Sequence, residues 1–376
     1  MGKKFLALLL SSVMCVSLLA GCGSSSSDTT EETAQEETEE EEETEEAEVD
    51  EETEEAADTE GTDYSDMTIA IVTKSAGNPY NELEASGFQE VVESYGATCI
   101  VVHPESATVE AQISEIQSLI SQEVDAICVA ANDEDALQAT LEEAMDAGIM
   151  VSCLDSKVNA ESRATFVNQA GVYEVAQALM DAVLDLTGGE GQWAILSATS
   201  QASNQNAWIA AMEDIATGDE YAGLELVEIA YGDDESQKST DQTEALLANY
   251  PDLKVICSPT TVGIAAAAKV IQESDTDVKL TGLGLPSEMA AYIGEGDDYA
   301  CPYMYLWNPI DVGALGAYVS IALVEGTITG AAGETFDAGD MGTYTIQEAD
   351  DGGTEVIVGP PFEFTPDNID EWKDVY

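Results

Sequence analysis

The stretch MTIAIVTKSAGNPYNELEASGFQEVVESYGATCIVVH, residues 67–103, carries in order the signals of a strand, a helix and a second strand. Met67–Thr73 and Ala97–His103 are short runs rich in branched apolar residues, which is typical of strands covered on both faces. Between them, the residues that recur at the spacing of one helical face are Leu83, Gly87, Val91 and Tyr95. This order predicts a parallel pair of strands with the helix packed across it.

The same alternation continues along most of the chain. Helical spacing recurs, for example, at Val109, Ile113, Ile116 and Ile120. The branched apolar runs are Met67–Thr73, Ala97–His103, Ala126–Ala131, Met150–Asp155, Trp193–Ala198, Leu224–Tyr231, Lys254–Ser258 and Val278–Leu285. They form two similar sets, within residues 66–165 and 166–300. The sequence therefore predicts an α/β fold of two doubly wound parallel-sheet lobes joined by a multi-strand hinge.

The first 22 residues carry the signals of export. Two lysines precede an apolar run from Phe5 to Ala20, which is too short for a membrane-spanning helix and ends in small residues. The segment Leu19-Ala20-Gly21-Cys22 resembles the bacterial lipobox, in which the cysteine is diacylated and becomes the new N-terminus. We expect residues 1–21 to be a lipoprotein signal peptide and Cys22 to be lipidated. An ordinary signal peptide with an incidental cysteine is the alternative.

Residues 22–65 are predicted to be a disordered acidic linker. Residues 23–63 hold 21 Asp or Glu and no Lys or Arg, so this segment repels itself and cannot bury a core. Its carboxylates do not have the spacing of a calcium loop, which argues against a metal-binding tract. The protein is therefore expected to be extracytoplasmic and anchored to the cell membrane by its N-terminal lipid, with a folded part at residues 66–376.

The charge of the folded part limits its partners. Beyond the linker the chain carries a net charge of about −47, which argues against nucleic acid and against direct adhesion to an anionic membrane. The cysteines beyond Cys22 are widely spaced, with no CxxC and no Cys/His cluster, so neither zinc nor a redox motif is supported. We expect free thiols, most of them buried, and neither a metal nor a cofactor.

Polar residues gather where the predicted strands end. In a doubly wound sheet these ends face the ligand crevice. The segments there are Thr73–Tyr80, Ala131–Asp133, Leu154–Ser156, Ser203–Asn206, Ser258–Thr261, Gly284–Pro286 and Leu306–Pro309. Their amides, hydroxyls, lysine, carboxylate and tryptophan suit a small polyhydroxylated ligand, because amides and carboxylates bind vicinal hydroxyls while an aromatic face covers the C–H side. Taken singly, residues such as Asn78 and Asn204 could equally be helix caps.

From about Asp66 to Asp370 the chain resembles the type I periplasmic sugar-binding proteins of ABC importers. The resemblance is to the branch that contains rhamnose-binding proteins and the autoinducer-2 receptor. The segments that carry it are Gly77–Tyr80, Asn204–Ile209, Tyr231–Asp234, Pro259–Ala267, Thr281–Ser287, Leu306–Pro309 and Gly359–Pro361. Runs of this length, in order, are specific for the branch and less specific for the ligand.

The resemblance implies a ligand set. Asp155 matches the family's hydroxyl-binding carboxylate, while Asn204 and Thr261 are the residues that rhamnose binders show where the autoinducer-2 receptor has Asp and Ala. Together with the strand ends it implies ligand binding by Lys74, Asn78, Tyr80, Asp155, Asn204, Gln205, Pro259, Thr261, Trp307 and Asn308. The two differences from the autoinducer-2 receptor, at Asn204 and Thr261, favour rhamnose or a related deoxysugar as the ligand. They do not exclude autoinducer-2, because the lysine, aspartate, glutamine and proline are kept.

The implied function is binding, not catalysis. The resemblance indicates a monomeric, lipid-anchored substrate-binding protein that captures a small sugar between its lobes and delivers it to ABC permease subunits. Uptake of autoinducer-2, or sensing for a membrane signalling partner, are the alternatives. An enzyme is disfavoured because His103 is the single histidine, and Thr281-Gly282-Leu283-Gly284 lacks the third glycine of a dinucleotide fingerprint.

The expected lobes are discontinuous. Lobe 1 is predicted at about residues 66–166 and 309–341, and lobe 2 at about 167–306 and 342–376. The chain is expected to cross between them near Phe166–Gln169, near Tyr305–Pro309 and near Met341–Tyr344.

Overall fold

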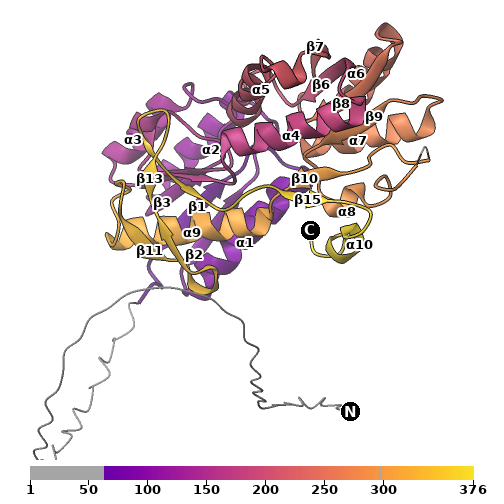
Figure 1. The fold of residues 1–376 in the computed structure, drawn as a ribbon. Coiled ribbons are helices and arrows are strands. Elements are labelled where there is room, and N and C mark those ends of the chain that lie inside the picture. The colour runs from indigo at the N-terminus through magenta and orange to yellow at the C-terminus, as the bar shows by residue number, and fades with distance from the viewer. Residues whose placement is uncertain (1–62, 297) are drawn as a thin grey trace, which may run out of the picture. The chain divides into compact units, whose positions relative to one another are not determined.

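The computed structural model describes residues 63–296 and 298–376 (Figure 1). The predicted signal peptide at 1–21, the predicted lipidation at Cys22 and nearly all of the predicted linker at 22–65 lie outside the described residues. No helix within the described ranges is long and apolar enough to cross a membrane.

The first sheet has seven strands, and all of its neighbouring pairs except β13–β14 are parallel. In their order across the sheet they are β13 (Gln347–Glu348), β14 (Thr354–Ile357), β5 (Phe166–Asn168), β4 (Met150–Leu154), β3 (Ala126–Val129), β1 (Thr68–Val72) and β2 (Thr98–Val102). Alternate residues of β1 enter different cores: Ile69 and Ile71 pack on one face, Ala70 and Val72 on the other. This two-sided burial explains why the strand reads as a continuous apolar run.

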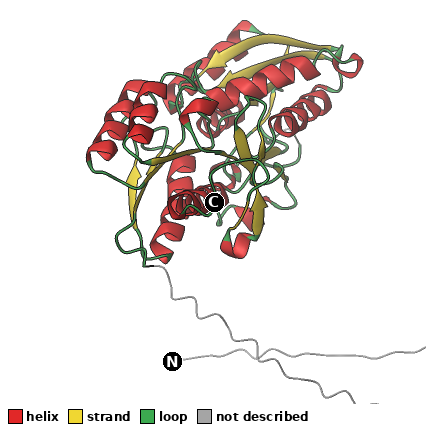
Figure 2. Cartoon of the chain, turned by 90° about the vertical axis from the view of Figure 1, so that its left-hand side faces the viewer, coloured by secondary structure: helices red, strands yellow, loops and turns green. Residues whose placement is uncertain are grey.

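Helices cover both faces of this sheet. The two cores define the layers: Phe88 and Leu315 belong to one, Leu119 and Leu141 to the other. The helices that carry these residues are α1 (Pro79–Ser94) and α9 (Pro309–Glu325) in the first layer, and α2 (Val109–Ser121) and α3 (Gln138–Asp146) in the second. Figure 2 shows the strands lying between helices.

The second sheet has four parallel strands in the order β7-β6-β8-β9. They are β6 (Gly191–Ser197), β7 (Leu224–Tyr231), β8 (Leu253–Ser258) and β9 (Lys279–Gly282). The helices around them are α4 (Val172–Thr187), α5 (Ser203–Ile215), α6 (Ser236–Asn249), α7 (Thr261–Glu273) and the short α8 (Pro286–Met289). Trp193–Ser197 is buried throughout, so both faces of β6 are covered. The predicted α/β fold class with two parallel-sheet lobes is confirmed, and each predicted apolar run overlaps a strand.

Three segments join the two sheets. The chain leaves the first sheet after β5, and it returns from β10 (Met304–Leu306) into α9. The third segment, residues 358–361, leads from β14 to β15 (Phe362–Phe364), which pairs antiparallel with β10 between the two halves (Figure 1). It runs beside the first, because Val358 N donates to Asn168 O at 2.9 Å and Gly359 N to Gln169 O at 3.4 Å.

The predicted crossing near Met341–Tyr344 is wrong, and with it the assignment of all of 342–376 to lobe 2. A two-stranded antiparallel sheet, β11 (Thr335–Asp337) with β12 (Thr343–Thr345), occupies that region. The strands β13 and β14 then extend the first sheet, since Glu355–Ile357 pairs in parallel with Phe166–Asn168. Only the part from β15 through the short α10 (Ile369–Trp372) lies with the second half. Strands this short and polar carry little hydrophobic pattern from which their sheet could be predicted.

The returning helix α9 is held close to α1 by glycines. A Cβ on Gly313 would lie 1.8 Å from Glu84 O, and one on Gly87 would lie 2.1 Å from Ile310 O. Both obstacles are backbone atoms, so the two helices must approach with no side chain at these points. This close contact fixes α1, whose first turn carries Asn78 and Tyr80, against the chain segment that carries Trp307.

We expect Gly313→Ala to destabilise the protein by roughly 1–3 kcal/mol, because the added methyl forces α1 and α9 apart. The sign of this change in unfolding free energy is diagnostic, because a Gly→Ala substitution inside a helix otherwise stabilises a protein. Urea unfolding of the full chain measures the effect. Gly359→Ala is the control, because nothing lies within 4 Å of a Cβ at that position. Equal or greater stability of Gly313→Ala would contradict the close helix contact.

Candidate functional site

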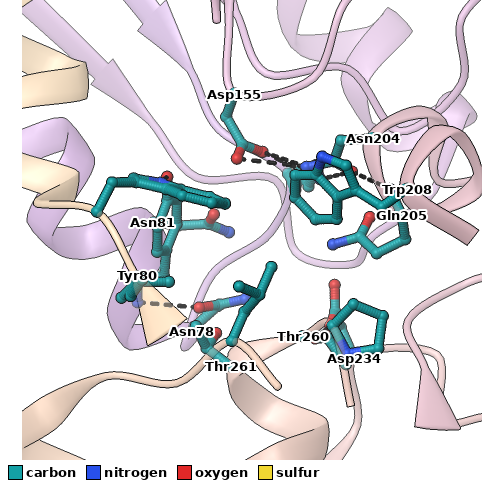
Figure 3. A pocket seen from close by; sticks show the side chains of 15 residues that line it. Asn78, Tyr80, Asn81, Asp155, Asn204, Gln205, Trp208, Asp234, Thr260 and Thr261 are labelled. Carbon is teal, nitrogen blue, oxygen red and sulfur yellow. Dashed lines mark hydrogen bonds and ion pairs between the residues drawn. The ribbon is translucent and has the colours of Figure 1, made fainter. Parts of the chain in front are cut away.

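A pocket lies where the carboxyl ends of both sheets meet (Figure 3). Its lining combines amides, hydroxyls, one ammonium, two carboxylates and an apolar wall. The lining residues are Lys74, Asn78, Tyr80, Asn81, Asp155, Asn204, Gln205, Trp208, Asp234, Pro259, Thr260, Thr261, Leu283, Leu306 and Trp307.

A three-residue contact joins the two halves at this pocket. Lys74 follows β1 and Asp155 follows β4, and their Nζ and Oδ2 atoms are 3.1 Å apart, with side chains 7% and 6% exposed. Lys74 Nζ also donates at 3.0 Å to the Oδ1 of Asn204, which lies in the first turn of α5 in the second half. Asn204 Nδ2 donates in turn to both carboxylate oxygens of Asp155 at 3.3 Å. Each of the three side chains therefore contacts the other two.

Asp155 is held in a left-handed conformation, with φ at 55°. An aspartate tolerates this region better than most residues. Ser156 Oγ donates to its Oδ2 at 2.9 Å, and Gln169 Nε2, in the first crossing segment, donates to its Oδ1 at 3.4 Å. With Lys74 and Asn204, these donors satisfy a carboxylate that is almost fully buried.

The pocket amides are only partly used by the protein. Asn78 Oδ1 caps α1 by accepting from Tyr80 N at 3.0 Å, which leaves its amide nitrogen for the pocket. Asn81 Nδ2 donates to Ser75 O at 2.9 Å, which leaves its oxygen. Gln205 Oε1 is buried and has no hydrogen-bond partner. Unused donors and acceptors together suit hydroxyl groups, which both donate and accept.

Two tryptophans form the apolar wall. The rings of Trp208 and Trp307 are 5.6 Å apart and inclined at 53°, and Leu283 and Leu306 also line the pocket. Trp307 Nε1 donates to Tyr80 Oη at 2.7 Å, so the indole N–H of Trp307 has a partner while its ring remains available for apolar contact. Removal from water raises the pKa of Tyr80 well above its usual value, which keeps the phenol neutral.

Behind the pocket, Glu84 is fully buried on α1, one turn after Tyr80. Neither of its carboxyl oxygens has a hydrogen-bond partner. Burial raises its pKa well above the ordinary value of 4.5, and the Asp155 carboxylate raises it further, while Lys74 acts in the opposite direction. Its burial and the nearby carboxylate therefore favour the neutral acid at Glu84.

The second half contributes the turns at the ends of β7 and β8. Thr260 is the N-cap of α7, and its Oγ1 donates to Asp234 Oδ1 at 2.8 Å. Pro259 and Thr261 flank it in the pocket lining. The first turn of α7 has no side-chain cap, so its N–H groups remain available to an oxygen in the pocket. In α5, Gln205 N donates to Asn204 Oδ1 at 3.0 Å.

The structure brings nine of the ten predicted ligand residues to one pocket. The exception is Asn308, which lies outside the lining and caps α9 through a 3.0 Å hydrogen bond from Ile310 N to its Oδ1. The lining residues outside the predicted ligand set are Asn81, Trp208, Asp234, Thr260, Leu283 and Leu306. Thr260 and Leu306 lie in the predicted strand-end segments but were not assigned to the ligand, and the strand-end rule could also have found Asp234, which follows β7. Asn81 and Trp208 lie inside helices, where that rule does not apply.

The groups that catalysis or metal binding would use lie mostly outside this pocket. His103 lies outside the pocket lining, with Nδ1 2.8 Å from Thr73 Oγ1 and Nε2 3.4 Å from Glu82 Oε2. In the described part of the chain, no group of three or more His, Cys, Asp or Glu could hold a metal ion. The five cysteines there are free thiols, and burial raises the pKa of Cys153 and Cys257 to about 11 and about 12, so these thiols stay protonated.

Comparisons with known proteins agree with this geometry. The family of the periplasmic binding protein domain matches residues 69–328. A solute-binding protein of an ABC transporter from Clostridium phytofermentans, solved with bound L-rhamnose, is 57% identical, with a TM-score of 0.81 over 82% of this chain and 99% of that one. The D-apiose import binding protein of Actinobacillus succinogenes is 26% identical over 57% of this chain and 68% of its own length. LsrB from Clostridium saccharobutylicum, solved with AI-2, is 22% identical with a TM-score of 0.75 over 81% of this chain and 99% of that one, and it shows the fold alone.

Glu84→Gln should change how stability depends on pH. The pKa of Glu84 is raised in the folded state, so its contribution is complete below about pH 4.5, where the unfolded chain is also protonated, and is lost as pH rises toward the folded pKa. The free energy of unfolding of Glu84→Gln, minus that of the parent, should therefore grow with pH, by at most about 1.4 kcal/mol per pH unit.

Urea unfolding of the full chain from about pH 4 to 9 measures this difference. Glu90→Gln removes the same charge from the exposed face of the same helix and is the control. An identical pH dependence in both variants would show that the effect comes from the loss of negative charge in general and not from burial of Glu84.

Proposed function

The chain belongs to the periplasmic binding protein domain family, and we propose that it is the substrate-binding protein of an ABC importer, capturing a small neutral sugar and delivering it to a permease. The observation that carries the proposal is a pocket whose polar and aromatic lining comes from side chains of both halves. A ligand there contacts Asp155 from one half and Gln205 from the other, so it stabilises the arrangement in which the halves meet. We propose that the protein acts as a monomer.

L-Rhamnose or a related deoxysugar is the proposed ligand. The 57% identical relative was solved with L-rhamnose, and the chain matches that protein over nearly its full length. The pocket supports this choice, because the amides and carboxylates suit ring hydroxyls while Trp208, Trp307 and the two leucines suit a methyl group and the C–H face of the ring. Among the predicted residues, Asp155 acts as the main acceptor, and Lys74, Asn78, Asn204 and Gln205 supply donors.

Autoinducer-2 is the second candidate. Lys74, Asp155, Gln205 and Pro259, which the resemblance assigns to both ligands, all line the pocket. Asn204 and Thr261 favour the sugar. A role as ligand sensor would use the same pocket and differ only in the membrane partner, so the binding reaction does not distinguish it from uptake.

We propose binding without chemical change of the ligand. The pocket lining of this structure holds neither a histidine nor a cysteine, and its buried carboxylate, Asp155, is committed to four donors from the protein. A group fixed in this way suits recognition, because it is pre-ordered for a hydroxyl and already ion-paired.

The proposed location is the outer face of the cell membrane. Residues 1–21 would direct export, Cys22 would carry the lipid, and the acidic linker at 22–65 would separate the anchor from the sugar-binding domain at 66–376. The lobes of that domain are proposed as 66–168 with 309–357, and 169–308 with 358–376.

Calorimetric titration of the purified protein tests the ligand. We expect L-rhamnose to bind at least about 10-fold more tightly than D-arabinose and than autoinducer-2, because only the deoxysugar fills the apolar wall while meeting the polar lining. Tighter binding of autoinducer-2 would move the assignment to the second candidate. Absence of binding by every neutral sugar tried would overturn the sugar-binding proposal.

A second prediction concerns the anchor. Cys22→Ala should release the protein into the medium or leave its signal unprocessed, because the residue to be acylated is lost. Membrane fractionation and the mass of the N-terminal peptide measure the outcome. Cys15→Ala is the control, since it removes a cysteine from the apolar run and should leave tethering unchanged. A Cys22→Ala protein that is processed and tethered like the parent would contradict the lipoprotein assignment.

A further inference from the structure

Asp234 lies across the pocket from Asp155, at the turn that follows β7 (Figure 3). The turn is fixed to the neighbouring strand β6, because Gly232 N donates to Ser197 O at 2.9 Å and Asp233 N to Ala198 O at 3.1 Å. Asp234 therefore has a defined place in the second half, as Asp155 has in the first.

The backbone at this turn is unusual. Asp233 and Asp234 both have φ at 53°, so two successive residues other than glycine adopt the left-handed conformation. Asp is among the few residues that enter this region at modest cost, yet two in a row still raise the energy of the turn. The conformation separates the two carboxylates: Asp233 pairs with Lys238 outside the pocket, with a side chain 43% exposed, whereas Asp234 lines the pocket.

The protein uses only part of the Asp234 carboxylate. Oδ1 accepts from Thr260 Oγ1, and within residues 63–296 and 298–376 no basic side chain forms an ion pair with Asp234. Lys74, the one cation of the lining, is committed to Asp155 and Asn204. Removal from water raises the pKa of Asp234, and the effects of Lys74 and of the Thr260 hydroxyl, which lower it, offset this only in part. Oδ2 remains as an acceptor without a donor from the protein.

We propose that Asp234 is a ligand-binding residue of the second half, accepting a hydrogen bond from a hydroxyl on the side of the sugar opposite Asp155. The inference rests on the proposed sugar-binding function and defines its ligand class. Two carboxylates on opposite sides of a pocket with one ammonium select a neutral ligand with hydroxyl donors on both sides. They disfavour a ligand that carries a carboxylate or a phosphate, because its charge would meet two like charges.

The variants can separate binding from a structural role. Asp234→Asn keeps an oxygen that can accept from Thr260, tolerates a positive φ and removes only the charge. Asp234→Gly also tolerates the conformation and removes the carboxyl group altogether. Asp233→Asn is the matched control, since it has the same φ and is the adjacent residue, but its carboxylate lies outside the pocket.

The experiment is calorimetric titration of each full-length variant with L-rhamnose and with analogues that each lack one ring hydroxyl. We expect affinity for L-rhamnose to fall about 10-fold in Asp234→Asn and up to about 100-fold in Asp234→Gly, and to stay within about twofold in Asp233→Asn. For the analogue that lacks the hydroxyl bound by Asp234, the Asn substitution should have almost no further effect. A hexuronic acid should bind the parent at least about 100-fold more weakly than L-rhamnose does.

Parent-like affinity of both Asp234 variants, or an equal loss for every analogue, would overturn this assignment while leaving the proposed function intact. Tight binding of the hexuronic acid by the parent would overturn the ligand class. If the parent binds no neutral sugar at all, the proposed function fails instead. The thermal midpoint of Asp234→Asn without ligand should match that of Asp233→Asn, and a lower midpoint with unchanged affinity would assign Asp234 to the stability of the turn.

Discussion

The contact of Lys74, Asp155 and Asn204 is the constraint on which the site depends. A buried ion pair carries a large desolvation cost, which is offset only if geometry and further hydrogen bonds are complete. Here Asn204 contacts both charged groups, and Ser156 and Gln169 complete the donors around the carboxylate. Because Asn204 comes from the other half of the molecule, full satisfaction of this buried pair requires the two halves to meet. The polar contact that would bind a ligand is therefore also a contact that sets the relative position of the halves.

The parallel sheets explain why these residues could be found from the sequence. Carboxyl ends of parallel strands share one edge, so Lys74 after β1 and Asp155 after β4 lie close together although 80 positions separate them in sequence. The eight apolar runs gave the strands for the same reason, since strands buried on both faces are apolar without interruption. The resemblance to a known family added the individual ligand positions. Asn308 was predicted as a ligand residue but lies outside the pocket lining, where it caps α9. An Asn-Pro pair at a helix start is compatible with either role, and the sequence alone does not distinguish helix capping from ligand binding.

The features that could not be predicted from the sequence depend mostly on contacts between residues far apart in the chain. The strand Thr354–Ile357 joins the first sheet through its pairing with Phe166–Asn168, and nothing local in a four-residue strand specifies its partner. For this reason the third crossing was predicted near Met341–Tyr344, whereas in the structure it lies at residues 358–361. Glu84 is a similar case: a glutamate on a helix is normally solvated, and only the close packing of α1 on α9 through Gly87 and Gly313 makes it a buried neutral acid. Such a role depends on backbone distances that a helical pattern does not contain.

The distribution of charge in the pocket follows from these packing constraints. Three carboxyl groups lie in or behind a pocket with a single lysine, and three ionised carboxylates there would repel one another in a medium of low polarity. Burial raises the pKa of Glu84 and so favours its neutral form, while the ion pair with Lys74 at 3.1 Å orients the Asp155 carboxylate. Asp234 differs from both: among the described residues it forms no ion pair, Thr260 donates to its Oδ1, and burial raises its pKa while Lys74 acts in the opposite direction. A hydroxyl donor from a neutral ligand would satisfy this group without adding charge. A polyhydroxylated ligand would thus meet the buried Asp234 carboxylate with a hydroxyl donor and add no charge to the pocket.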